Sequence, residues 1–145
     1  MSSLARDNNG RVVPHDDPTS IPDDELLVRN IHEFQDNPGA DPRPSSGSFS
    51  PTNKGKDPYE GMSVDMLSRL KACGVDQKTR WGPNHVGSVV IRAGDLRQLG
   101  LKIGPDPSDY DGKDPDHYHA NVWGVKPRHK KKIRASAQWY IKPEA

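Results

Sequence analysis

Apolar and polar residues alternate most clearly between Glu25 and His32, in the segment ELLVRNIH. Leu27, Arg29 and Ile31 share one face of an extended chain, and the residues between them share the other. Because both faces carry apolar side chains, the pattern predicts a strand that is covered on two sides. An arginine in the middle of such a strand needs partners, since an unpaired buried charge is costly.

A helical pattern follows between Ser63 and Cys73. Leu67 and Leu70 fall on one helical face, and Ser63 is placed to cap the first turn. Gly74 follows directly and can adopt the left-handed conformation that ends many helices. We therefore expect one helix over residues 63–73.

The rest of the pattern completes a small domain. It predicts strands at Gly87–Ile91, Leu101–Ile103 and His119–Val125, a short helix at Ala93–Leu99, a short strand at Gly47–Phe49, and an amphipathic helix within Lys126–Ile141. The predicted fold class is α+β, with a mainly antiparallel sheet of about four to five strands, two packed helices and long loops. Residues 1–25 are expected to be an extended N-terminal segment, and residues 26–145 one domain with a long loop at 34–60.

The composition agrees with a small core and long loops. The chain has 145 residues, of which 31% are hydrophobic, with 13 glycines and 14 prolines. Its net charge of +1 provides no overall attraction to nucleic acid or membrane, so local charge matters more. Cys73 is the single cysteine, which excludes an internal disulfide and a multi-cysteine zinc site.

Hydropathy predicts a location in the cytoplasm. No stretch approaches the roughly 20 apolar residues of a membrane-spanning helix. The first residues also lack the apolar run of a signal peptide. We therefore expect no membrane partner.

A His-x-His pair is the first candidate for chemistry. His117 and His119 stand two residues apart at the start of a predicted strand, where they would project from one face. Asp114 or Asp116 would then supply an oxygen ligand for a divalent metal, as would Asp109 or Asp111. The alternative is a solvated loop in which the aspartates form turns. We expect no cofactor, with a divalent metal at this pair as the alternative.

Arg29 and a serine-rich segment form the second candidate. An arginine on an early strand, followed by Ser46 and Ser48, is similar to the arrangement in Arg-Ser-Glu ADP-ribosyltransferases. That resemblance implies that Arg29 would hold dinucleotide phosphates, a pairing that suits a guanidinium. The Glu-x-Glu motif of those enzymes is absent from the chain. The alternative is an arginine paired inside the protein.

His32 and His85 are isolated in the sequence, and we expect both to be ordinary surface or packing residues.

A basic run near the C-terminus is the third candidate. Six cations lie within nine residues and no acidic residue interrupts them: Lys126, Arg128, Lys130, Lys131, Lys132 and Arg134. Phosphate contact is one interpretation, with Trp139 and Tyr140 as nearby aromatic residues. A solvated helix face is the other. Together with His119 and Trp123, these cations form the predicted binding edge.

Several segments resemble an uncharacterised family of short bacterial proteins. They are PHDDP at 14–18, IPDDELLVR at 21–29, SSGSF at 45–49, MSVD at 62–65 and HANVWG at 119–124. The resemblance implies a compact bacterial domain of this length. It implies no activity and no catalytic residue.

Each catalytic arrangement in the sequence lacks a member. The favoured prediction is therefore a small cytoplasmic binding or accessory protein without catalysis of its own. It would contact a protein partner or nucleic acid through its loops and basic run. The alternative is a small enzyme, either transferase-like around Arg29, Ser46 and Ser48 or a metal-dependent hydrolase or nuclease around His117 and His119.

Overall fold

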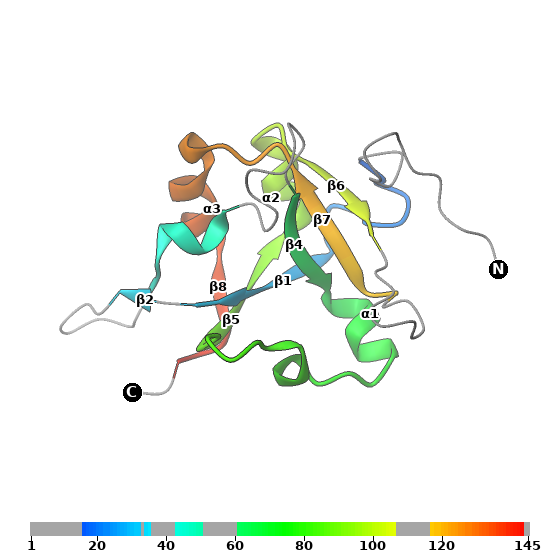
Figure 1. Cartoon of the computed structure of the whole chain (residues 1–145). Helices are drawn as coiled ribbons and strands as arrows, with labels where there is room; N and C mark the ends of the chain where they lie inside the picture. The colour runs from blue at the N-terminus through cyan, green and yellow to red at the C-terminus, as the bar shows by residue number, and fades with distance from the viewer. Residues whose placement is uncertain (1–15, 33, 36–42, 51–60, 107–116, 144–145) are drawn as a thin grey trace.

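An antiparallel sheet runs through the computed structural model, which describes residues 16–32, 34–35, 43–50, 61–106 and 117–143 (Figure 1). Its strand order is β6-β7-β4-β1-β5-β8. The strands are β1 Leu26–Ile31, β4 Gly61–Met66, β5 Gly87–Arg92, β6 Lys102–Pro105, β7 His119–Trp123 and β8 Gln138–Ile141. β2 (Phe34–Gln35) and β3 (Arg43–Pro44) form a separate pair. The predicted α+β class is confirmed, with six strands in the main sheet.

Short helices connect and cover these strands. The α-helices are α1 Leu67–Ala72, α2 Ala93–Gln98 and α3 Lys130–Ser136, each of which lies within a segment predicted to be helical. The 3-10 helices include η1 Ser46–Phe49, η2 Gln77–Arg80 and η4 Pro127–His129. Residues 16–25 also pack on the domain, because Asp17 donates its backbone N–H to the carbonyl of Ile103 and Ile21 is fully buried.

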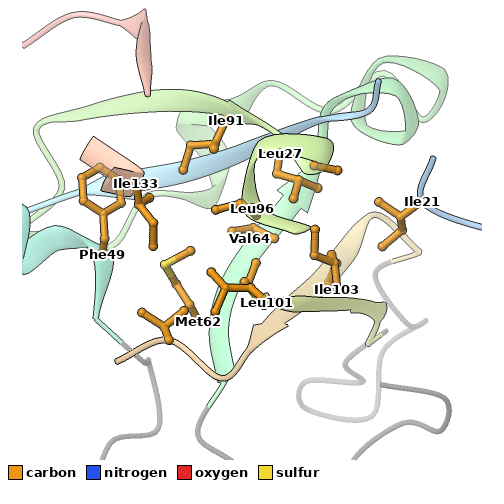
Figure 2. Close-up of a cluster of buried hydrophobic side chains, with 14 of the residues drawn as sticks. Ile21, Leu27, Phe49, Met62, Val64, Ile91, Leu96, Leu101, Ile103 and Ile133 are labelled. Carbon is orange, nitrogen blue, oxygen red and sulfur yellow. The ribbon is translucent and has the colours of Figure 1, made fainter. Parts of the chain in front are cut away.

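One face of the sheet carries the main hydrophobic core and is called here the apolar face. Leu27 of β1 lies opposite Ile91 of β5 and Met66 of β4, and all three are fully buried. Figure 2 shows this cluster closing around Leu96 of α2 and Ile133 of α3. The strand predicted from the alternation of residues 25–32 is therefore β1, and it has buried side chains on both sides.

The opposite face is called here the polar face. Its apolar part is small: Val28 packs with Leu67 and Leu70 of α1. The rest consists of side chains at the alternate positions of four strands: Asn30 of β1, Ser63 and Asp65 of β4, Ser88 of β5, and His119 and Asn121 of β7. Most of these are buried, so the sheet places hydrogen-bonding groups where a small domain commonly has apolar ones.

The middle of the sheet is not evenly paired. β1 and β5 pair over six positions, whereas β1 and β4 pair only at Leu27↔Met66 and Val28↔Asp65. Beyond Val28 the two strands diverge, and Figure 1 shows β4 crossing away from β1 at a steep angle. This divergence leaves strand edges unpaired at the centre of the sheet, and it positions the candidate site.

Three predicted elements were wrong in type or extent. The helix expected at 63–73 begins only at Leu67, and Ser63 lies in β4 rather than at a helix cap. The strand expected at 47–49 is the 3-10 helix η1, which Ser45 caps by accepting from the N–H of Gly47. The helix expected within 126–141 ends at Ser136, and the chain then forms the edge strand β8.

Candidate functional site

A cleft of about 410 Å³ opens where β1 and β4 diverge. Its lining comes from four segments that are distant in sequence: Val28, Arg29, Asn30 and His32; Gly47, Ser48 and Ser50; Ser63, Val64 and Asp65; and His85. The volume lies within the range of small-molecule sites, about 300–1,000 Å³. Most of the lining residues are polar or charged, so the cleft offers several hydrogen-bonding groups to a ligand.

The guanidinium of Arg29 spans the gap between the two strands. Its Nη1 donates to the carbonyl of Ser63 in β4 at 2.8 Å. Its Nε and Nη2 donate to the carbonyls of Ser48 and Ser50 at 3.0 and 3.2 Å. These bonds join β1 to β4 and to the η1 segment in the region where β1 and β4 are not paired.

Burial affects the charge of this arginine. Desolvation lowers the pKa of Arg29 to about 10, because removing a cation from water disfavours its charged form. The side chain still carries its positive charge at neutral pH. The sequence-based expectation that Arg29 needs partners is met by backbone carbonyls of η1 and β4, together with the serine that follows η1.

Two imidazoles stand at the rim of the cleft. The rings of His32 and His85 lie with their centroids 4.3 Å apart, tilted by 45°. Burial lowers the pKa of His85, and the positive charges of His32 and Arg29 lower it further. Nδ1 of His85 accepts the backbone N–H of Gly82 at 2.7 Å. These two residues, isolated in the sequence, therefore meet at the site.

A hydrogen-bond network connects the polar face of β1, β4 and β5 with η2. Asn30 accepts from Nε2 of Gln77 and from Oγ of Ser88, both at 2.8 Å. Asp65 accepts from Gln77 at 3.3 Å and pairs with Arg80 at 3.3 Å. This network attaches η2 to the sheet and fixes Asn30 and Asp65, which both line the cleft.

His119 and Ser63 form a second polar arrangement beside the cleft. Nε2 of His119 is in close hydrogen-bond contact with Oγ of Ser63. Nδ1 of His119 lies 2.5 Å from the backbone carbonyl of Asp106. Asn121 donates to the carboxylate of Asp106 at 2.5 Å. His119 is only 7% exposed, so these contacts occur out of water.

His117 and His119, the predicted metal-binding pair, have different surroundings in the structure. His117 is exposed in a turn, and its carbonyl accepts from Arg69 at 3.2 Å. His119 begins β7 as predicted, and both of its ring nitrogens have partners within the protein. Within the described residues, no three His, Cys, Asp or Glu side chains form a metal-binding group. Asp109, Asp111, Asp114 and Asp116 lie outside the described residues, so a metal there stays a prediction.

The transferase-like candidates are only partly brought together. Arg29 and Ser48 line the same cleft, whereas Ser46 is absent from its lining. Ser48 is 5% exposed and contributes its carbonyl to Arg29. Transferase activity stays a prediction.

The basic run divides between surface and interior. Lys126, Arg128, Lys131 and Lys132 are exposed, and Lys130 is half-buried. Nε of Arg134 donates to the carbonyl of Pro44 at 2.8 Å, which joins α3 to the chain before η1. The other members of the predicted binding edge, His119 and Trp123, are 7% and 6% exposed, so their side chains point into the protein.

Sequence reasoning missed several cleft residues, namely Asn30, Ser63, Asp65, His32 and His85, as site members. The alternation in GMSVDM was a usable signal, because it places Ser63 and Asp65 on one face of a strand. No local signal shows that β1 and β4 diverge.

No helix in the described part of the chain has both the length and the apolar character needed to cross a membrane. Comparisons with family models, with curated proteins and with solved structures gave no match.

Proposed function

We propose that this chain is a binding protein of the bacterial cytoplasm, and that its ligand is a small anionic molecule held in the cleft between β1 and β4. The observation that carries the proposal is the guanidinium of Arg29, held in the wall of a cleft of about 410 Å³. A cation held in place in a partly desolvated site attracts an anion more strongly than a cation in water.

The surroundings of Arg29 support an anionic ligand. Burial lowers the pKa of His85 most, and the positive charges of His32 and Arg29 lower it further, which means that this part of the cleft disfavours additional positive charge. A bound anion would reverse that effect and favour the protonated imidazole. Binding of an anion should therefore be stronger under mildly acidic conditions, where His85 can take up a proton.

The elements that hold the cleft favour binding without large rearrangement. Asn30 and Asp65 are held by η2, and Arg29 is fixed by three carbonyls. Side chains fixed in this way lose little rotamer freedom when a ligand binds.

A thermal-shift and calorimetric screen with phosphate, pyrophosphate, citrate and nucleoside monophosphates tests the proposal. We expect at least one of these anions to bind the native protein. Arg29→Gln should weaken that binding by about tenfold or more, and Arg29→Lys by less, because the ammonium retains the charge but not the fork of donors.

Arg92→Gln provides the matched control, since Arg92 is exposed and pairs with Asp95 at 3.6 Å, away from the cleft lining. It should bind like the native protein. Arg29→Gln also removes three hydrogen bonds, so its folding is checked by circular dichroism, and His32→Ala at the exposed rim provides a second binding variant. Equal affinity in all four variants would contradict the proposal.

Nucleic-acid contact through the basic run is a second candidate function. The exposure of Lys126, Arg128, Lys131 and Lys132 on one continuous segment favours it. A single-stranded oligonucleotide should then bind with an affinity that falls as salt rises, and Lys131→Ala with Lys132→Ala should reduce the salt slope. Binding that is insensitive to salt would argue against this candidate.

An ADP-ribosyltransferase-like activity is a weaker alternative for the same cleft. Arg29 and Ser48 support it, while the missing Glu-x-Glu and the position of Ser46 outside the lining do not. Incubation with labelled NAD and a mixture of acceptor proteins would detect transfer.

A further inference from the structure

We propose that Ser63 is a nucleophile activated by His119, and that the cleft transfers the acyl group of small anionic carboxylic esters. This inference rests on the proposed function, since it takes the cleft as the place where the substrate binds. It departs from the prediction that the protein has no catalysis of its own.

The tautomer of His119 follows from its neighbours. The backbone carbonyl of Asp106 can only accept a hydrogen bond, so Nδ1 of the imidazole must carry the hydrogen. In the neutral ring, Nε2 then has a lone pair and must accept from the hydroxyl of Ser63. The arrangement is a hydroxyl donating to a base that a third group orients, which is the geometry of activated serine nucleophiles.

Two hydrogen bonds with Asp106 hold the base in place. Asp106 donates its backbone N–H to the carbonyl of His119 at 2.9 Å and accepts from the ring of the same residue. Asn121 holds the side chain of Asp106 at 2.5 Å. Asp106 is therefore a positioning residue that fixes both the backbone and the ring of His119.

Ser63 stands where a ligand in the cleft can reach it. It is half-buried, lines the cleft, and shares the polar face with Asp65. Its own carbonyl accepts from the guanidinium of Arg29 at 2.8 Å. Negative charge that develops on an acyl oxygen in the cleft would therefore form in a site whose wall holds a fixed cation, which stabilises it.

Two other serines among the described residues, Ser50 and Ser88, donate to oxygen atoms instead. The hydroxyl of Ser50 donates to the carbonyl of Gly47 at 2.8 Å, and that of Ser88 donates to the side-chain oxygen of Asn30 at 2.8 Å. Neither acceptor can take up a proton at neutral pH, whereas an imidazole can. Reactivity is therefore expected at Ser63 and not at these positions.

The reaction is written in two balanced steps. Oγ of Ser63 attacks the carbonyl carbon of the ester while Nε2 of His119 takes the hydroxyl proton, and the bond to the leaving alkoxide breaks as His119 returns the proton to it. Water then attacks the acyl-serine, His119 takes a proton from that water, and the free acid leaves as Ser63 recovers its hydrogen. The net change is ester plus water giving acid plus alcohol, without another reactant.

A fluorophosphonate probe tests the nucleophile without knowledge of the natural substrate. Attack by Ser63 forms an oxygen–phosphorus bond and expels fluoride, and the hydroxyl proton leaves through His119. Intact mass spectrometry of the full chain should show one label per molecule, and peptide mapping should place it on Ser63. His119→Gln should slow labelling by about 100-fold or more, as removal of a general base does.

Ser68→Ala is the matched control, because Ser68 is exposed on α1 and hydrogen-bonds Glu25 instead of an imidazole. It should label at the native rate. Ser63→Ala should abolish labelling while circular dichroism confirms that the variant folds, which separates loss of the nucleophile from loss of structure. Labelling elsewhere, or labelling of Ser63 that does not depend on His119, would overturn the inference.

Two chromogenic esters test the substrate class. Mono-p-nitrophenyl succinate carries a negative charge and p-nitrophenyl acetate does not, so the native protein should hydrolyse the succinate with the higher kcat/KM. If anions bind the cleft but Ser63 is unreactive, the proposed binding function stands and this inference fails. If Ser63 reacts and no anion binds, the nucleophile stands, and the proposed function and the anionic substrate class fail.

Discussion

The two faces of the central sheet use the same strands in opposite ways. On the apolar face, Leu27, Met66 and Ile91 bury their whole side chains in one hydrophobic cluster. On the polar face, the buried groups of the same sheet include Ser88 and Asp65, each with specific hydrogen-bond partners. The same alternation of residues therefore produces two interiors with different chemistry.

The apolar face and the polar face contribute differently to the stability of this domain. Apolar burial provides a favourable free energy that depends little on direction, at about 25 cal/mol per Å². Buried polar groups contribute less net stability, because each hydrogen bond replaces one with water. A small domain that buries so many polar groups loses some stability and obtains fixed donors and acceptors beside a cleft.

The largest expected effect is on the apolar face. Leu27→Ala should lower the free energy of unfolding by about 3 kcal/mol, because it removes a fully buried side chain and leaves a cavity. Urea denaturation followed by circular dichroism measures it. Leu26→Ala is the control, since the neighbouring leucine is 38% exposed and should cost well under half as much. Equal losses would show that the two faces of β1 are not distinguished by burial.

A smaller effect is expected on the polar face. Asn30→Ala should cost about 2 kcal/mol, because Gln77 and Ser88 lose their acceptor and the carbonyl of Arg80 loses a donor. The same denaturation experiment measures it, with Asn84→Ala as the exposed control. A change below about 0.5 kcal/mol would mean that water takes over the hydrogen bonds of the Asn30 side chain without a loss of stability.

The smallest expected effect is the change in the free energy of unfolding with pH. Burial and neighbouring positive charges lower the pKa of both His85 and His129 from the ordinary value of 6.5. The unfolded chain therefore binds protons at a higher pH than the folded protein, so this contribution to stability is complete above 6.5 and decreases as the pH falls through the lowered values. Unfolding curves between pH 7.5 and 5 should show the decrease, and His85→Gln should make it shallower. A rise in stability towards pH 5 that His85→Gln abolishes would contradict the sign.

Prediction from the sequence succeeded where one local pattern decided the structure. β1, β5 and β7 begin within one residue of their predicted positions, because alternation in β1 and short runs with β-branched or aromatic residues in β5 and β7 identify strands without further context. It failed at Ser63, where MSVDML fits both a helix start and a strand. The pairing of Ser63 with Asn121 in β7 decided for the strand.

The C-terminal segment failed for a related reason. Ile133 and Ile141 are spaced as they would be on one helical face, yet only the first lies in α3. β8 forms because Ile141 and Trp139 can pair with the exposed edge of β5. A four-residue edge strand has too few residues to show its own period.

What the sequence by itself determined is the class of the domain, the central strand β1 and the requirement that Arg29 find partners. What only the tertiary structure decided is the cleft, because it exists where β1 and β4 diverge after two paired positions. The contact of His119 with Ser63 was likewise decided by the register of β4 and β7, which brings residues 56 positions apart together. Alternation shows which side of a strand a side chain occupies, whereas strand pairing decides what it meets there.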